Sequence, residues 1–389
     1  MKLQMKKGFA LTGAALLLAL SACSAASTSA SSSASASVSA SSQASLAYDS
    51  SVSTGHTEFF VRDNGDGTKV IKDYTGKEIT IPTKVERLAN AWHANNQVVV
   101  LLGGGPNLVA TTEYVKTIPW MKQVFPGIEN VAAPVKTDNS LNMEELIAAK
   151  PDVVLVSNTK QREAVENAGL VGVQIGGWSD LSGVQKGISL AAEVLGTQGA
   201  YDRSVQYNKY QQHNIDLIKD RLEDLPESAK PKVLHIGTGT KVKNVTGSGV
   251  IIDEWIKLAG GINAASSVNG MKDVSMEQIQ SFAPDIIIIG GDTSEQGLET
   301  ITSDPTWADI PAVKNHRVIR NPYGTFNWDR YSAEGALQVL WAAQLLHPDK
   351  FTDINMVKET RDFYKTYYGY DLTEDEAKLI LAGDPPTKK

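Results

Sequence analysis

The strongest constraint on the fold is a segment that occurs twice in the chain. Residues 143–156 read MEELIAAKPDVVLV and residues 276–289 read MEQIQSFAPDIIII, an offset of 133 residues. Each copy opens with a pair of the capping-box type, Asn142 with Glu145 and Ser275 with Gln278. A proline then ends the helix, and the four apolar residues after the aspartate are typical of a buried parallel strand. The repeat therefore predicts two lobes built on one plan.

Strand and helix patterns alternate on both sides of the repeat. A hairpin is predicted over residues 69–82, about a turn at 74–77, and alternating strands and helices follow it. The segment 199–225 interrupts this alternation and has no Gly or Pro inside it, so we expect one unbroken helix of about 40 Å. The pattern then resumes. The expected fold is α/β, with two Rossmann-like lobes of mostly parallel sheet joined by a single long connecting helix.

The first residues have the pattern of a secretory signal. Three lysines precede an apolar run from Phe9 to Leu20 that is too short to span a bilayer. The box LSAC at residues 20–23 resembles the bacterial lipoprotein signal, which implies cleavage before Cys23 and lipidation of its thiol; an ordinary signal peptide is the alternative. Residues 24–47 are almost entirely Ser and Ala, which favours a solvated tether.

Charge and cysteine content exclude several classes of partner and site. Removing the signal leaves 34 of the 37 basic residues against 44 acidic ones, which disfavours nucleic acid as a partner. Cys23 is the only cysteine in the sequence, so a disulfide, a thiolate zinc cluster or an iron–sulfur centre cannot form within the chain. We therefore expect no cofactor and no structural metal.

From about residue 67 to 348 the chain resembles the substrate-binding proteins of ABC importers for iron–siderophore, haem and cobalamin. The resemblance rests on the hairpin ending in Ile-Pro, the strand with RLANAW, the two repeats, the lone connecting helix and the helix SAEGALQVLWAAQLL. It implies a monomeric, non-enzymatic receptor held at the outer face of the cell membrane. The expected divisions of the chain are a signal (1–22), a lipidated tether (23–57), an N-terminal lobe (58–185), a helical connector (186–228), a C-terminal lobe (229–350) and a helical extension (351–389).

Glu144 and Glu277 have no structural task in the repeat, although each lies in the first turn of an exposed helix. In the family, glutamates at the matching positions dock onto arginines of the permease dimer, which implies that role here. The alternative is that two acids favour the helix dipole, an effect of about 0.3–1 kcal/mol each.

Ligands of open α/β sheets bind beyond the carboxyl ends of the strands, so the loops after the strands should supply the binding residues. The expected set is Trp92, His93, Tyr114, Asn158, Arg162 and Trp178 from the first lobe, and Thr238, Thr240, Asp292, Tyr323, Trp328 and Arg330 from the second. The aromatic members favour a flat or bulky ligand such as a metal chelate, with an iron–siderophore as the leading expectation. Haem, a corrinoid and an oxyanion such as molybdate remain open.

Several of these residues have a second interpretation. Aromatic residues at the start of a loop, such as Trp92 and Trp328, can also pack within or between the lobes. His93 could ligate a chelated metal or cap a helix. Arg330 suits a carboxylate, phosphate or oxyanion, or else a salt bridge to Asp329 or Glu334. The GTGT turn at residues 237–240 could present N–H groups to ligand oxygens, but it lacks the third glycine of a dinucleotide loop.

Three other functional classes fit the sequence less well. A surface enzyme would need a nucleophile elbow, a metalloprotease helix or a phosphate loop, and the sequence contains none of these motifs. A zinc or manganese receptor would need about three His or carboxylate ligands, yet of six histidines only His93 falls in an expected binding loop. An adhesion module would not explain the paired glutamates.

Overall fold

The computed structural model describes residues 55–177 and 179–387. The predicted signal, Cys23, nearly all of the tether and Trp178 lie outside these residues. No helix in the described part is long and apolar enough to cross a membrane.

The predicted hairpin is part of a three-stranded antiparallel sheet. Its order is β1(Phe60–Asp63), β2(Thr68–Lys72), β3(Glu78–Pro82), with Val70 opposite Thr80. Gly76 has a φ of 83° in the predicted turn, a conformation that glycine adopts without steric cost. Strand β1 was not expected from the sequence.

The first lobe is a five-stranded parallel sheet of order β6-β5-β4-β7-β8. Its strands are β4(Leu88–Asn90), β5(Leu108–Thr112), β6(Ala132–Val135), β7(Val153–Val156) and β8(Gly172–Gln174). Its helices are α1(Asn96–Leu101), α2(Pro119–Val124), α3(Met143–Ala148) and α4(Thr159–Asn167). The sequence patterns predicted all of these except β6 and α2.

The second lobe is a mixed sheet of order β12-β10-β9-β13-β14, with β11 beside β9. Its strands are β9(Lys232–Ile236), β10(Asn244–Thr246), β11(Ile262–Asn263), β12(Met271–Asp273), β13(Ile286–Ile289) and β14(Val318–Arg320). Its helices are α7(Ile251–Leu258), α8(Met276–Phe282), α9(Ser294–Ser303) and α10(Pro311–Lys314). Strands β9, β11, β13 and β14 are parallel, whereas β10 and β12 add an antiparallel edge. The prediction of α/β lobes with mostly parallel sheets is therefore confirmed.

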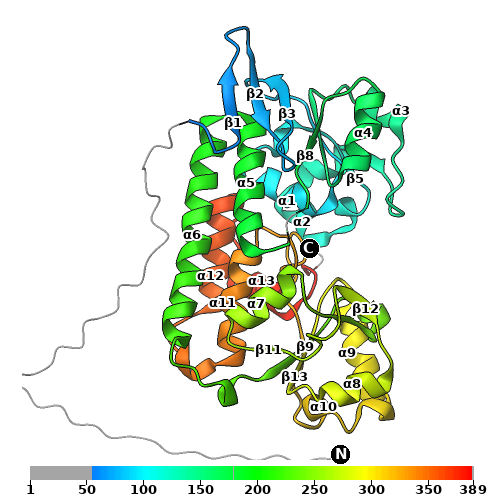
Figure 1. The fold of residues 1–389 in the computed structure, drawn as a ribbon, viewed down its shortest axis with the longest axis vertical. Helices are drawn as coiled ribbons and strands as arrows, with labels where there is room; N and C mark the ends of the chain where they lie inside the picture. The colour runs from blue at the N-terminus through cyan, green and yellow to red at the C-terminus, as the bar shows by residue number, and fades with distance from the viewer. Residues whose placement is uncertain (1–54, 178, 388–389) are drawn as a thin grey trace, which may run out of the picture. The chain divides into compact units, whose positions relative to one another are not determined.

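The two sheets are joined by a helical pair, α5(Leu181–Leu195) and α6(Gln198–Leu222) (Figure 1). Gly196 ends α5 with a φ of 67°, and a Cβ there would lie 1.9 Å from the Thr83 carbonyl oxygen. The Thr197 side chain then caps α6. Helix α6 is unbroken over its 25 residues and packs on α5 and on α11(Gly335–Leu346), as the prediction of a single connecting helix requires.

The C-terminal extension is helical and contacts both lobes. It contains α12(Met356–Phe363), a π-helical turn (Tyr364–Tyr368) and α13(Glu374–Ala382). The indole N–H of Trp120, on α2, donates to the Asp384 carbonyl at 2.8 Å. The backbone N–H of Tyr323 donates to the Ile380 carbonyl at 3.0 Å, so the same extension supports the second lobe. Short 3₁₀ turns complete the fold at His93–Asn95, Gly105–Asn107, Val115–Thr117, Pro126–Asn130, Glu227–Ala229, Gly239–Lys241, Pro305–Trp307 and Pro348–Lys350.

The repeated segment adopts the same helix-to-strand structure twice. Lys150 and Ala283, at the shared offset, both have left-handed φ values, 48° and 43°, before the proline. The carboxylate of Asp152 accepts from the N–H of Arg87 at 2.8 Å, and that of Asp285 accepts from the N–H of Lys232 at 2.8 Å. Each aspartate thus fixes the start of the neighbouring strand, a role that the sequence patterns did not reveal.

The capping prediction is correct for one copy only. Ser275 and Gln278 form the full reciprocal box. The Asn142 side chain caps α3, but the Glu145 carboxylate turns away to the N–H of Ala133 and the ammonium of Lys136, both at 3.1 Å. Glu145 therefore joins α3 to β6, the strand that the sequence did not predict.

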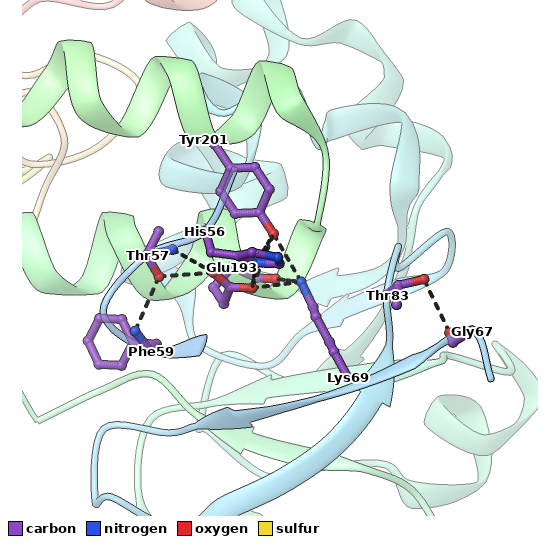
Figure 2. A network of polar contacts seen from close by, with 8 residues as sticks. All are labelled: His56, Thr57, Phe59, Gly67, Lys69, Thr83, Glu193 and Tyr201. Atoms are coloured by element: carbon purple, nitrogen blue, oxygen red, sulfur yellow. Dashed lines mark hydrogen bonds and ion pairs between the residues drawn. The ribbon is translucent and has the colours of Figure 1, made fainter. Parts of the chain in front are cut away.

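A buried polar cluster fastens the hairpin sheet to the α5–α6 junction (Figure 2). Lys69, on β2, and Glu193, on α5, form an ion pair of 2.9 Å with side-chain exposures of 1% and 0%. The Tyr201 hydroxyl, on α6, lies 3.1 Å from both partners, and Glu193 also accepts from the N–H of Thr57 at 2.8 Å. The end of the predicted tether is thus held beside the N-terminal end of the connecting helix α6.

Candidate ligand-binding site

Loops from both lobes meet in one aromatic cluster beyond the carboxyl ends of the strands. His93 follows β4 and Tyr114 follows β5, and their rings lie 5.7 Å apart. Phe326, in the loop after β14, lies 5.8 Å from His93 and 6.3 Å from Tyr114 between ring centroids. Phe326 lies within the stretch YGTFNWDR but was not itself predicted, because an aromatic in a loop has no periodicity that would show its direction.

A second aromatic contact joins the lobes beside the first. Trp92, at the end of β4, packs on Tyr331 with ring centroids 4.6 Å apart. The Tyr331 hydroxyl lies 3.4 Å from the Asn95 side-chain oxygen. Trp92 is only partly buried, whereas Tyr331 is buried. The sequence patterns did not identify Tyr331.

The polar groups of the cluster are neutral donors beside one cation. Burial, and then the positive charge of Arg330, lower the pKa of His93, so its imidazole is neutral at pH 7. Burial raises the pKa of Tyr114, the negative charge of Asp292 acts in the same direction, and hydrogen bonding to Tyr323 opposes them. Both groups can therefore offer a hydrogen bond without adding charge.

Tyr323 and Asn327 complete the polar side of the cluster. Burial raises the pKa of Tyr323, with the neighbouring Tyr114 as the next cause, so this hydroxyl also keeps its proton. Asn327 is buried and pairs with Tyr323 in a short antiparallel bridge, yet its side-chain oxygen has no hydrogen-bond partner among the described residues. An amide oxygen only accepts hydrogen bonds, but amide oxygen and nitrogen are assigned from their surroundings, and the flipped amide would present an N–H donor to a ligand.

Arg330 supplies the positive charge. One terminal nitrogen of its guanidinium (Nη2) donates to the Gly237 carbonyl, and its Nε lies 3.4 Å from the Asp329 carboxylate. Arg330 therefore forms the alternative salt bridge to Asp329 through its Nε atom. Its other terminal nitrogen, Nη1, has no hydrogen bond within residues 55–177 and 179–387. The side chain is 34% exposed, so this nitrogen can reach a ligand.

A family model described as "Periplasmic binding protein" matches residues 92–323, more than half of the chain. The match includes Trp92, His93 and Tyr114 and ends before Phe326 and Arg330. The chain belongs to the periplasmic binding protein family. The family predicted from the sequence is thereby confirmed, and the protein is a binding protein, not an enzyme.

Individual family members are similar over most of their length. The molybdate-binding protein MolA of Haemophilus influenzae is 28% identical over 340 residues, covering 79% of this chain and 93% of that protein. Its structure with molybdate bound superposes with a TM-score of 0.69 at 25% identity, over 78% of this chain and 99% of the other. A periplasmic solute binding protein of Veillonella parvula gives a TM-score of 0.70 at 29% identity, over 81% and 97%.

A more distant family member carries a lipoprotein name. The ABC transporter substrate-binding lipoprotein YvrC of Bacillus subtilis is 23% identical over 254 residues, covering 64% of this chain and 76% of that protein.

The expected residues of the GTGT turn lie beside the cluster but are largely engaged. The Thr238 hydroxyl lies 2.9 Å from that of Thr293 and 3.2 Å from that of Thr240. The N–H of Gly239 donates to Thr293 at 3.0 Å, so it is not free for a ligand. Asp292 is exposed, and its charge acts on Tyr114.

Three expected ligand residues have structural roles instead. Arg162 is buried, and its guanidinium donates to the carboxylate of Asp73 at 2.6 Å, which fixes the hairpin turn against α4. Asn158 caps α4 by accepting from the N–H of Gln161. Trp328 has 0% exposure and lies in the main hydrophobic core, so it has no surface to offer a ligand. A side chain after a strand can turn inward as easily as outward, and in this fold these three side chains are engaged in contacts within the protein.

Glu144 and Glu277 lie in the first turns of α3 and α8, and both are exposed. The pKa of Glu277 is lowered by its own backbone N–H and by Ser275. Within the described part of the chain, neither carboxylate has a salt-bridge partner. Nor does this part contain a group of three or more His, Cys, Asp or Glu side chains placed to hold a metal ion.

Proposed function

We propose that the protein is the solute receptor of an ABC importer and that it binds a small oxyanion of the molybdate class between its lobes. The observation that carries this proposal is the free terminal nitrogen of Arg330 beside neutral hydroxyl, imidazole and amide groups. A tetrahedral anion needs one charge partner and several hydrogen-bond donors, and guanidinium is well suited to oxyanions. The similarity to MolA over 93% of its length supports the same ligand class.

The spacing of the aromatic rings also favours a small ligand. His93, Tyr114 and Phe326 contact one another at 5.7–6.3 Å between centroids, which is direct contact between rings. A haem or corrinoid macrocycle would have to separate these rings before it could bind. An anion with four oxygen atoms needs space only at the polar side, next to Tyr114, Tyr323 and Arg330.

A metal chelate is the second candidate, and Trp92 is the observation that favours it. Its indole packs on Tyr331 but is partly exposed, as a stacking surface for a flat ligand would be. A chelate such as an iron–siderophore would bind against Trp92, with the lobes further apart.

We extend the proposal to the permease and the membrane. Glu144 and Glu277 occupy equivalent exposed positions in the two lobes and would dock onto cationic side chains of a permease dimer. Such exposed ion pairs are individually weak and mainly fix orientation. The LSAC box and the similarity to YvrC support a lipid on Cys23 that holds a monomeric receptor outside the cytoplasm.

A thermal-shift panel distinguishes the two ligand candidates. Molybdate, tungstate, sulfate, a ferric siderophore, haemin and cobalamin are each added to the mature protein. A ligand at 100 times its Kd should stabilise the fold by about 2.7 kcal/mol. Stabilisation by molybdate and tungstate is expected, and stabilisation by the chelates alone would transfer the proposal to the second candidate.

The anchor needs a separate experiment. Cys23→Ser should release the protein from the membrane fraction without changing ligand binding. Retention of the variant in membranes would contradict lipidation at this residue.

A further inference from the structure

We infer that a buried chain of three side chains, Thr246, His235 and Asp329, positions the Arg330 guanidinium for ligand oxygen atoms. The inference deepens the proposed function and rests on it, because it takes Arg330 as the residue that meets the anion. His235 lies on β9 and Thr246 lies on β10. Both residues are on strands and not in the loops after them, so the sequence did not suggest a role in binding.

The contacts run in an unbroken line. The Thr246 hydroxyl lies 2.9 Å from Nδ1 of His235, and Nε2 of His235 lies 2.9 Å from one oxygen of Asp329. The other oxygen of Asp329 lies 3.4 Å from Nε of Arg330. His235, Thr246 and Asp329 are fully buried or nearly so, whereas Arg330 is partly exposed at the end of the line.

One arrangement of protons satisfies every member. If Nε2 of a neutral His235 carries the proton, it donates to Asp329, while Nδ1 accepts from the Thr246 hydroxyl. Asp329 then remains the carboxylate. Burial acts against its ionisation, but Arg330 and then His235 outweigh it and hold the pKa of Asp329 below its ordinary value.

The surroundings prevent the carboxylate from moving. A Cβ on Gly290 would lie 2.0 Å from the Asp329 oxygen that faces His235, so only glycine leaves room for the carboxylate in this place. The backbone carbonyl of Asp329 accepts from the Trp255 indole N–H at 3.1 Å. A fixed carboxylate therefore presents one fixed oxygen to Arg330.

This arrangement leaves the useful end of Arg330 free. Nη2 of Arg330 donates a hydrogen bond to the Gly237 carbonyl, and Nε lies beside the Asp329 carboxylate. In the part of the chain that the structure describes, neither Nε of Arg330 nor the nearer oxygen of Asp329 forms a hydrogen bond at 3.4 Å, and a small shift of Arg330 toward Asp329 would satisfy both. The guanidinium thus lies between the Gly237 carbonyl and the Asp329 carboxylate, which leaves Nη1 for the ligand at little cost in ordering on binding.

The test compares substitutions along the line by calorimetric titration of molybdate into the full mature protein. His235→Leu removes both contacts at similar volume, and His235→Gln keeps a donor and an acceptor. We expect His235→Leu to weaken molybdate binding roughly tenfold and His235→Gln to restore most of that loss. His347→Leu is the control, since it removes a histidine of the same lobe whose ring nitrogen lies 3.1 Å from the Gly260 carbonyl oxygen and not beside Asp329.

Two further measurements separate positioning from a loss of stability. The ¹⁵N resonance of the Arg330 Nε–H should be sharp in the wild type and in His347→Leu, and broadened in His235→Leu. If His235→Leu does not fold, Thr246→Val should give the same broadening and a smaller loss of affinity. Wild-type affinity and a sharp resonance in whichever variant folds would overturn the inference.

Arg330→Gln distinguishes a failure of the proposed function from a failure of the positioning chain. If this variant binds molybdate as the wild type does, the proposed function fails at this residue. If Arg330→Gln loses binding while His235→Leu keeps it, the proposed function stands and only the positioning chain is refuted.

Discussion

The buried Lys69–Glu193 pair allows a stability prediction with a quantitative basis. Lys69→Met removes the ammonium but leaves the Glu193 carboxylate at 0% exposure. Breaking a buried pair from one side costs about 3–5 kcal/mol, because the remaining charge is uncompensated. Glu193 still accepts from the N–H of Thr57 at 2.8 Å and from the Tyr201 hydroxyl at 3.1 Å, so we expect the lower end of this range.

Scanning calorimetry and urea unfolding measure the loss. A cost of about 3 kcal/mol lowers the Tm of a chain of this size by about 6 °C. The matched control is Arg62→Met in the same sheet, whose pair with Glu78 has side-chain exposures of 58% and 49%. An exposed pair contributes about 0–1 kcal/mol, so this control should change Tm by less than about 2 °C.

The pH dependence gives a second check on the same variant. In Lys69→Met the buried Glu193 loses the lysine ammonium but keeps the His56 ring nitrogen at 3.2 Å. Burial then outweighs the remaining partners, so the folded-state pKa of Glu193 should rise above the ordinary value of 4.5. Stability then falls as pH rises through that pKa, and the deficit relative to the wild type should shrink toward pH 5. Equal losses in Lys69→Met and Arg62→Met, or a deficit independent of pH, would refute the reasoning.

Three further predictions concern other parts of the fold. Burial raises the pKa of Glu334 to about 7, against an ordinary value of 4.5. The folded protein therefore binds more protons between these values, and stability from this group is full below about pH 4.5 and lost as pH rises through about 7. Glu334→Gln should flatten that part of the pH profile of unfolding, and an unchanged profile would contradict the assignment. Gly196→Ala should lower the free energy of unfolding by about 2 kcal/mol or more, because the residue has a left-handed φ and its Cβ would meet the Thr83 carbonyl oxygen. Gly65→Ala is the control: Gly65 has a similar φ and none of the described atoms within 4 Å of its Cβ position, so thermal unfolding should show a loss of only about 1 kcal/mol. Replacing Glu144 and Glu277 together by arginine should abolish uptake by cells while the ligand affinity of the purified protein stays intact, and normal uptake would contradict docking through these residues.

The parts of the fold that were predictable are those with local signals. The repeat predicted α3, β7, α8 and β13, because capping residues, a proline and an apolar run are all read within one short segment. Strand β6 was missed because Pro134 stands in its middle, a residue that argues against a strand. Strand β12 was missed because all three of its residues are exposed, so it has no apolar pattern.

The binding site was only partly predictable because contacts distant in sequence decide the direction of each side chain. Tyr114, His93 and Arg330 were proposed from the rule that loops after strands meet at one edge, and these three residues do lie near one another. The same rule selected Arg162, whose partner Asp73 lies 89 residues earlier, and Trp328, which the core encloses. The sequence contains no signal for either contact. Phe326 and Tyr331 were missed for the same reason, since their partners belong to the other lobe.

The central claim is that a small oxyanion sits between the lobes against Arg330. Anomalous diffraction at the molybdenum edge, from crystals of the mature protein grown with molybdate, tests it most directly. We expect one strong peak within hydrogen-bonding reach, through its oxygens, of Nη1 of Arg330 and the Tyr114 hydroxyl. A peak only elsewhere on the molecule, or none at saturating molybdate, would contradict the account.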